Sequence, residues 1–121
     1  MKHIEDNLQI ACVRWFSLQY PRLSNYLHHS PNGGFRNLRE AGRFKQMGVR
    51  AGFPDLILLY PSGKYHYLCI ELKSEKGKQT ESQKKWHKMI QETGNKYVVC
   101  RNLDQFMTEI NNYMNLNQNM K

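Results

Sequence analysis

The sequence predicts a three-layer α/β domain, in which helices flank a mixed central sheet. Two apolar runs, residues 54–60 and 65–73, are separated by the turn residues 61–64, and this pattern predicts an antiparallel hairpin. A third strand at 97–100 follows a helical pattern, and a crossover helix places two strands parallel. The 121 residues, 40% of them hydrophobic, suffice for one core, so we expect a single domain over residues 1–121, ordered from about 3 to 114.

In the first half of the chain, apolar residues at three- and four-residue spacing predict a helix over residues 4–18. A short strand at 26–30 comes next, and Pro and Gly in the segment 31–34 are a strong turn signal. A second amphipathic helix is expected over 38–47. It ends at Gly48, where a glycine in the left-handed conformation would cap it.

In the second half, two helices begin with capping signals. Thr80 and Gln83 match a capping box, and the helix that they start has a buried stripe ending at Gly94. The same pattern begins at Asn102 and starts the last helix. The Asn-rich end of the chain from Asn115 is expected to fray.

The charge of the chain indicates a polyanionic partner. Lys and Arg number 18 against 10 Asp and Glu, which gives a net charge of +8 and a pI near 9.5. An excess of this size usually serves phosphate groups, as in nucleic acids.

Several classes of protein are excluded. The longest apolar run, residues 56–60, is far shorter than the roughly 20 residues of a membrane-spanning helix, and no secretory signal is evident at the start. The sequence has no zinc-ligand spacing and no phosphate-binding Gly-rich loop, so we expect neither a zinc site nor a nucleotide cofactor. Cys12, Cys69 and Cys100 are scattered among apolar residues, which predicts buried free thiols in a reducing cytoplasm.

The residues that could carry chemistry are Asp55, at the head of one predicted strand, and Glu71 and Lys73, at the end of its partner. Side chains alternate along a strand, so Glu71 and Lys73 share a face. Two neighbouring carboxylates repel each other, and Mg²⁺ commonly relieves this repulsion; the Leu72 carbonyl could add a ligand. The alternative is a solvated surface pair, but the apolar strand around these residues would make an uncompensated charge costly.

These residues resemble the signature of the PD-(D/E)XK nuclease superfamily, with Pro54-Asp55 followed by Glu71-Leu72-Lys73. More closely, the chain resembles the VRR-NUC family, the virus-type replication and repair nucleases, from its first helix to about Ile110. The segments that carry this resemblance are residues 29–34 with Arg36, residues 47–55, residues 71–73 and Gln83. One departure is Phe53, where members of the family usually have Val.

The resemblance implies a restriction-endonuclease-like core, with the element order αβββαβ, and a Mg²⁺ site that Mn²⁺ can also occupy. It implies that Asp55 and Glu71 bind the metal, together with the backbone carbonyl of Leu72. Lys73 would be the catalytic lysine.

Two further positions match the family. Glu5, on the first helix, would approach the metal through water, and Gln83 would support the site or a phosphate. Each has a second interpretation. Glu5 is also typical of a solvated first helical turn, and Gln83 of the capping box.

Basic residues near these positions are candidates for binding the DNA backbone rather than reading bases. A lysine-rich helix face is usually only solvated, but beside a phosphate-cleaving site it would give salt-dependent affinity for DNA. The candidates are Arg36, Arg50, Lys76, Lys78 and Lys84.

Similarity to the stand-alone, phage-type members of the family implies a DNA endonuclease that cuts branched DNA, with four-way (Holliday) junctions as the expected substrate. It also implies a homodimer, because symmetric cutting needs two active sites, and a place in the cytoplasm of a bacterial or phage-infected cell. Two alternatives remain open: a non-catalytic DNA-binding module that keeps the nuclease fold, and a nuclease that is active only with a partner protein. The sequence leaves the incision position, its polarity and cutting of RNA undecided.

Overall fold

The computed structural model describes residues 2–31 and 38–119. In chain order these residues form α1 (Lys2–Gln19), the 3₁₀ helix η1 (Pro21–Tyr26), β1 (Leu27–His29), α2 (Leu38–Gln46), β2 (Leu56–Leu58), β3 (Leu68–Leu72), α3 (Glu81–Glu92), β4 (Lys96–Cys100), α4 (Leu103–Met114) and α5 (Leu116–Asn119).

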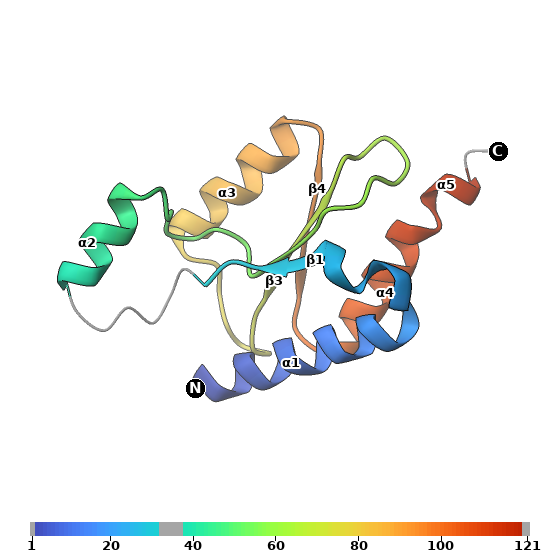
Figure 1. Ribbon diagram of the computed structural model, residues 1–121, viewed down its shortest axis with the longest axis horizontal. Helices are drawn as coiled ribbons and strands as arrows, with labels where there is room; N and C mark the ends of the chain where they lie inside the picture. Colours follow the sequence, from blue (N-terminus) through green and yellow to red (C-terminus); the bar gives the residue numbers. More distant parts are fainter. Residues whose placement is uncertain (1, 32–37, 120–121) are drawn as a thin grey trace.

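A four-stranded sheet with the order β1-β2-β3-β4 forms the middle layer. The pairs β1·β2 and β2·β3 are antiparallel, and β4 is parallel to β3. Figure 1 shows α1 and α4 on one side of the sheet and α3 on the other, while α2 stands away from the sheet. The predicted mixed α/β fold is therefore confirmed.

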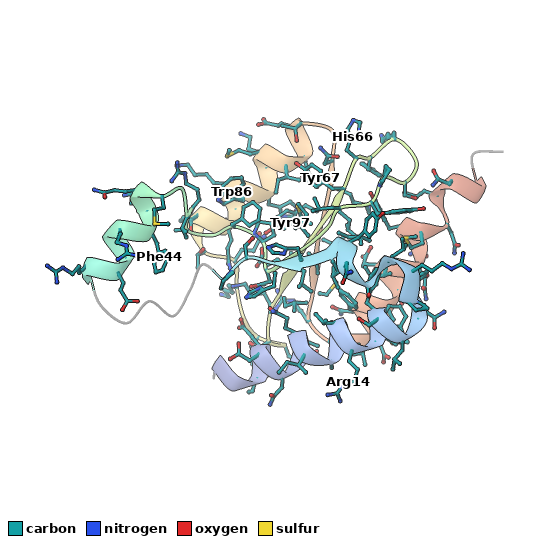
Figure 2. The ribbon with its side chains drawn as sticks, in the orientation of Figure 1. Arg14, Phe44, His66, Tyr67, Trp86 and Tyr97 are labelled. Carbon is teal, nitrogen blue, oxygen red and sulfur yellow. The ribbon has the colours of Figure 1, made fainter. Side chains whose placement is uncertain are left out.

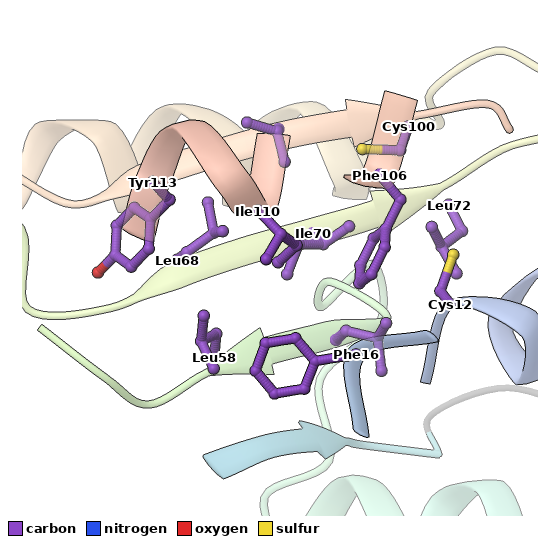
Figure 3. Close-up of a cluster of buried hydrophobic side chains, with 12 residues drawn as sticks. Cys12, Phe16, Leu58, Leu68, Ile70, Leu72, Cys100, Phe106, Ile110 and Tyr113 are labelled. Atoms are coloured by element: carbon purple, nitrogen blue, oxygen red, sulfur yellow. The ribbon is translucent and has the colours of Figure 1, made fainter. Parts of the chain in front are cut away.

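The two faces of the sheet bury different side chains. On the side of α1 and α4, the alternate residues Leu68, Ile70 and Leu72 of β3 pack against a large apolar cluster that includes Phe16 and Phe106 (Figure 3). The intervening residues face α3, where Cys69 packs with Ile90 and Tyr97. Since side chains alternate along a strand, Glu71 lies on the α3 face, next to Cys69.

The predicted helix starts are present, with one difference. In α3, the Thr80 side chain accepts a hydrogen bond from the backbone N–H of Gln83, and the Gln83 side chain accepts one from Thr80. In α4, Asn102 accepts from the backbone of Gln105, but the Gln105 side chain accepts from Arg101 rather than from the cap residue. The capping box is thus complete only in α3.

Two expectations about extent differ from the structure. The central strands β2 and β3 are shorter than the runs 54–60 and 65–73, because ladder pairing between them ends at Leu58 and Leu68 and the connecting loop keeps an isolated bridge between Ser62 and Tyr65. Residues from Leu116 do not fray at once but form α5, in which the Asn117 side chain accepts a 2.8 Å hydrogen bond from the N–H of Gly63. The predicted glycine turn within residues 31–34 lies mostly outside the described residues.

All three cysteines are free and buried, as predicted. Burial raises the pKa of each thiol to about 12. In the part of the chain that the structure describes, no helix has the length and apolar character needed to cross a bilayer.

Candidate active site

Asp55, Glu71 and Lys73 come together at one end of the sheet. Asp55 immediately precedes β2, Glu71 is the fourth residue of β3, and Lys73 follows β3. Leu56 pairs with Ile70, so one further step of the same antiparallel register brings Asp55 opposite Glu71. Two residues separated by 16 positions in the sequence therefore face each other across adjacent strands.

Glu71 is almost completely buried, with 1% of its surface exposed, and its two oxygens have different surroundings. Oε1 accepts hydrogen bonds from Gln79 Nε2 at 2.8 Å and from the Tyr97 hydroxyl at 2.5 Å. Oε2 is buried and accepts no hydrogen bond from the described residues. The Lys73 ammonium lies 3.7 Å from this oxygen. One oxygen of a buried carboxylate is thus left facing a positive charge without a donor.

Asp55 is held by backbone contacts on both sides. Its Oδ2 accepts a 2.7 Å hydrogen bond from the N–H of Leu72, and its carbonyl accepts one of 2.7 Å from Nδ1 of His29. Burial raises the pKa of Asp55, and the negative charges of Glu71 and Glu5 raise it further, against the opposing effects of the Leu72 hydrogen bond and of His29. A carboxylate in this position is costly to ionise, which is the electrostatic setting that a cation relieves.

Asp55→Asn is expected to make the metal-free protein more stable than the wild type at pH 7. A carboxyl whose pKa is raised by folding binds its proton more tightly in the folded state, so wild-type stability falls as pH rises above the ordinary aspartate pKa of about 3.9. Asn has no such titration and can still accept the hydrogen bond of Leu72. Urea unfolding in EDTA should show a gain for the variant at pH 7 that shrinks toward pH 4. Asp104→Asn, at an exposed position, is the control, and an equal gain at both pH values would contradict the expectation.

Glu5 lies near Lys73 but not in the immediate group of acids. It is half-buried in the first turn of α1 and lines a pocket of about 420 Å³ together with Lys73, Ser74 and Arg101. Its charge contributes to the raised pKa of Asp55. Both interpretations of Glu5, the indirect role at the metal and the solvated first turn, stay predictions.

Gln83 serves the helix start. Its side-chain oxygen accepts a 2.8 Å hydrogen bond from the N–H of Thr80, so the capping interpretation is confirmed. The same helix start is packed against the segment that leads to Asp55. Gly52 has a φ of +80°, and a Cβ there would lie 2.6–2.8 Å from atoms of Ser82 and Gln83. The helix start and the Asp55 segment are therefore held in close contact.

Trp86 holds the same segment through its side chain. Its ring N–H donates a 3.1 Å hydrogen bond to the carbonyl of Ala51, and its ring lies edge-on to Phe53, with 5.0 Å between centroids. The ring of Phe53 therefore has an aromatic partner on α3. Figure 2 shows Trp86 on α3 and Phe44 on α2; both line an apolar pocket of about 500 Å³.

The predicted DNA-binding residues fall in different places. Lys78 and Lys84 line one pocket of about 420 Å³ with Gln79 and Arg101. The Lys84 ammonium also lies 3.5 Å from Glu81. Lys76 is exposed in the loop after β3. These three lysines thus lie on the loop and helix that follow Lys73.

The two predicted arginines are less closely tied to the site. Arg50 is exposed, donates a 3.1 Å hydrogen bond to the carbonyl of Lys45, and lines the pocket beside Phe53. Arg36 lies outside the described residues.

The residues at this end of the sheet fit a hard divalent cation. The side chains of Asp55 and Glu71 supply carboxylate oxygens, the type of ligand that Mg²⁺ prefers, and Glu71 Oε2 is a buried oxygen to which no described residue donates. Within residues 2–31 and 38–119, no three His, Cys, Asp or Glu side chains gather into a metal-binding group. A cation here would therefore use two acids and complete its shell with carbonyl, water or phosphate oxygens, as Mg²⁺ commonly does.

Sequence reasoning missed Gln79, Tyr97 and Arg101. Gln79 and Tyr97 bind Glu71 through tertiary contacts that no spacing rule reveals. The Arg101 guanidinium donates to the carbonyls of Ser74, Glu75 and Gly77, and so closes the loop that follows Lys73.

Comparison with known proteins shows the family to which this fold belongs. Residues 3–103 match the sequence profile of the VRR-NUC domain. A solved structure described as a VRR_NUC domain protein is 36% identical in sequence and superposes with a TM-score of 0.81, covering 93% of this chain and 88% of that one. Comparison with curated proteins gives no significant match. The chain belongs to the VRR-NUC family and has its nuclease-type fold.

Proposed function

We propose that this protein is a metal-dependent endonuclease that hydrolyses phosphodiester bonds in branched DNA, with four-way junctions as its preferred substrate. The observation that carries the proposal is the meeting of Asp55, Glu71 and Lys73 at one end of the sheet in a VRR-NUC fold. A family fold alone does not establish activity, but a decayed site would have no chemical need for all three groups.

Mg²⁺ is the proposed cofactor, with Mn²⁺ as a substitute. Asp55, Glu71 Oε2 and the Leu72 carbonyl would hold it, and Glu5 would act through water. A bound divalent cation makes water a better nucleophile at neutral pH and stabilises negative charge on phosphate oxygens. The chain contributes by keeping the two carboxylates at fixed positions. The N–H of Leu72 holds the Asp55 carboxylate, and Gln79 and Tyr97 hold the Glu71 carboxylate through Oε1.

Lys73 is the proposed catalytic lysine. Its side chain is 10% exposed, its ammonium group lies 3.7 Å from Glu71 Oε2, and its backbone N–H donates a 3.0 Å hydrogen bond to the carbonyl of Cys100. From there it would orient the attacking water and offset the charge that develops on the phosphate in the transition state. Gln83 would support the site indirectly, by fixing the start of α3.

The basic residues would bind the DNA backbone. Lys76, Lys78 and Lys84 lie on the loop and helix that follow Lys73. Together with the net charge of +8 of the chain, they favour contacts with phosphate groups rather than with bases. Arg36 and Arg50 are proposed to extend this surface. A homodimer would give the two active sites that symmetric incision of a junction needs.

Cleavage of a substrate panel tests the proposal. The purified protein is incubated in Mg²⁺, Mn²⁺ or EDTA with labelled four-way junction, splayed-arm, linear duplex and single-stranded DNA. We expect metal-dependent cutting, at least about tenfold faster for the junction than for the duplex. Light scattering measures the mass of the protein in solution, and we expect the mass of a dimer. Binding without cleavage in either metal would instead favour a DNA-binding module or a partner-activated subunit.

A further inference from the structure

The two carboxylate oxygens of Glu71 have different partners: Oε1 accepts two hydrogen bonds, and Oε2 accepts none from the described residues. We propose that Gln79 and Tyr97 are positioning residues, which occupy Glu71 Oε1 and thereby reserve Oε2 for a divalent cation. This inference rests on the proposed function, because it concerns the metal that the site would bind. It assigns roles to two residues that lie outside the sequence motif.

Gln79 reaches Glu71 from the loop that precedes α3. Its amide nitrogen lies 2.8 Å from Glu71 Oε1 and 3.1 Å from Nδ1 of His87. An NH₂ group has two protons, so it can donate one to the carboxylate and one to the imidazole. The reverse orientation would place the amide oxygen against the carboxylate, which is repulsive. The carboxylate therefore fixes the direction of the amide, and His87 gives the amide nitrogen a second contact.

Tyr97 reaches the same oxygen from β4. Its hydroxyl donates to Glu71 Oε1 at 2.5 Å, and its ring stacks on His87, with centroids 4.2 Å apart and an interplanar angle of 15°. Burial and the adjacent carboxylate raise the pKa of Tyr97, so the phenol keeps its proton and remains a donor. Gln79, His87 and Tyr97 thus form one connected group around a single carboxylate oxygen.

The arrangement decides which way the carboxylate faces. Oε1 accepts hydrogen bonds from the Gln79 amide and the Tyr97 hydroxyl. If the carboxylate turned away from these donors, both of them and the charged oxygen would lose their hydrogen bonds. Each unmade hydrogen bond is costly in a buried site. Oε2 remains with no donor from the described residues, 3.7 Å from the Lys73 ammonium. Partners that orient a metal ligand typically change metal affinity by about 10- to 100-fold when removed.

Tyr97→Phe and Gln79→Leu test the inference, because both keep the size of the side chain and remove the donor. Binding of Mn²⁺ to the DNA-free protein is measured by electron paramagnetic resonance, and junction cleavage is measured over a range of Mg²⁺ concentrations. Each variant is expected to need about tenfold or more metal for half-saturation in both assays, with a cleavage rate at saturating Mg²⁺ close to that of the wild type.

Tyr113→Phe is the matched control, since its hydroxyl makes a 2.7 Å hydrogen bond to the carbonyl of Tyr60, away from the site. It should leave the half-saturating metal concentrations unchanged. Circular dichroism checks that each variant is folded. If Tyr97→Phe does not fold, Gln79→Leu still tests the inference, because Gln79 lies in a half-buried loop position. Unchanged half-saturation in the folded variants would overturn the inference alone. A wild type that binds no Mn²⁺ and cuts no DNA would overturn the proposed function, and the inference with it.

Discussion

Lys73→Met is expected to lower the rate of junction cleavage by about 100- to 1,000-fold, which is the usual cost of removing one charge-stabilising group from an active site. Met keeps most of the length of the lysine side chain and removes its ammonium group, which lies 3.7 Å from Glu71 Oε2. DNA affinity should change little, because one nearly buried ammonium adds little to a surface with a net charge of +8.

The measurements are single-turnover cleavage in Mg²⁺ and fluorescence anisotropy of a labelled junction with Ca²⁺ in place of Mg²⁺. Lys64→Met is the matched control, because Lys64 is exposed in the loop at the other end of the β2–β3 hairpin. It should cut DNA at the wild-type rate. Full turnover by Lys73→Met would contradict the catalytic role of Lys73.

Gly52→Ala is expected to destabilise the fold by about 2–5 kcal/mol, through two separate effects. The left-handed backbone at Gly52, with φ +80°, costs an alanine about 1–2 kcal/mol. The added Cβ would also lie 2.6 Å from the backbone carbon of Ser82 and 2.8 Å from the backbone N of Gln83, and overpacking of this kind costs about 1–3 kcal/mol. Since backbone atoms cannot rotate away, either the start of α3 or the segment leading to Asp55 must move.

Gly94→Ala separates the two effects. Gly94 has a nearly equal φ of +84°, but a Cβ there meets nothing within 4 Å. Urea unfolding should therefore show a loss of only about 1–2 kcal/mol for this variant. Equal losses at the two positions would show that close packing against α3 does not constrain the Asp55 segment.

The sequence predicted those parts of the fold that depend on local patterns. Amphipathic spacing, the capping box at Thr80 and the turn between the central strands identified the helices and the hairpin, and alternation placed Glu71 and Lys73 together. Strand ends and the chain end were less accurate, because they depend on tertiary contacts such as the one between Gly63 and Asn117.

The residues of the candidate site also fall into two groups, those that the sequence predicted and those that only the structure shows. Asp55, Glu71 and Lys73 were found because strand register brings together residues that a short motif already marks. Gln79 and Tyr97 were not found, since each reaches Glu71 from a different element and neither has a spacing relation to it. A polar group that becomes buried by folding acquires partners that only the structure can show.

The most direct test of the central claim is the rate of four-way-junction cleavage by the wild type in Mg²⁺, by the wild type in EDTA, and by Glu71→Gln in Mg²⁺. Gln keeps the shape of the buried side chain but removes the charge that would hold the cation. We expect cleavage in the first reaction and a loss of at least about 100-fold in the other two. Equal cleavage by Glu71→Gln, or cleavage that persists in EDTA, would contradict a metal-dependent centre built on Asp55, Glu71 and Lys73.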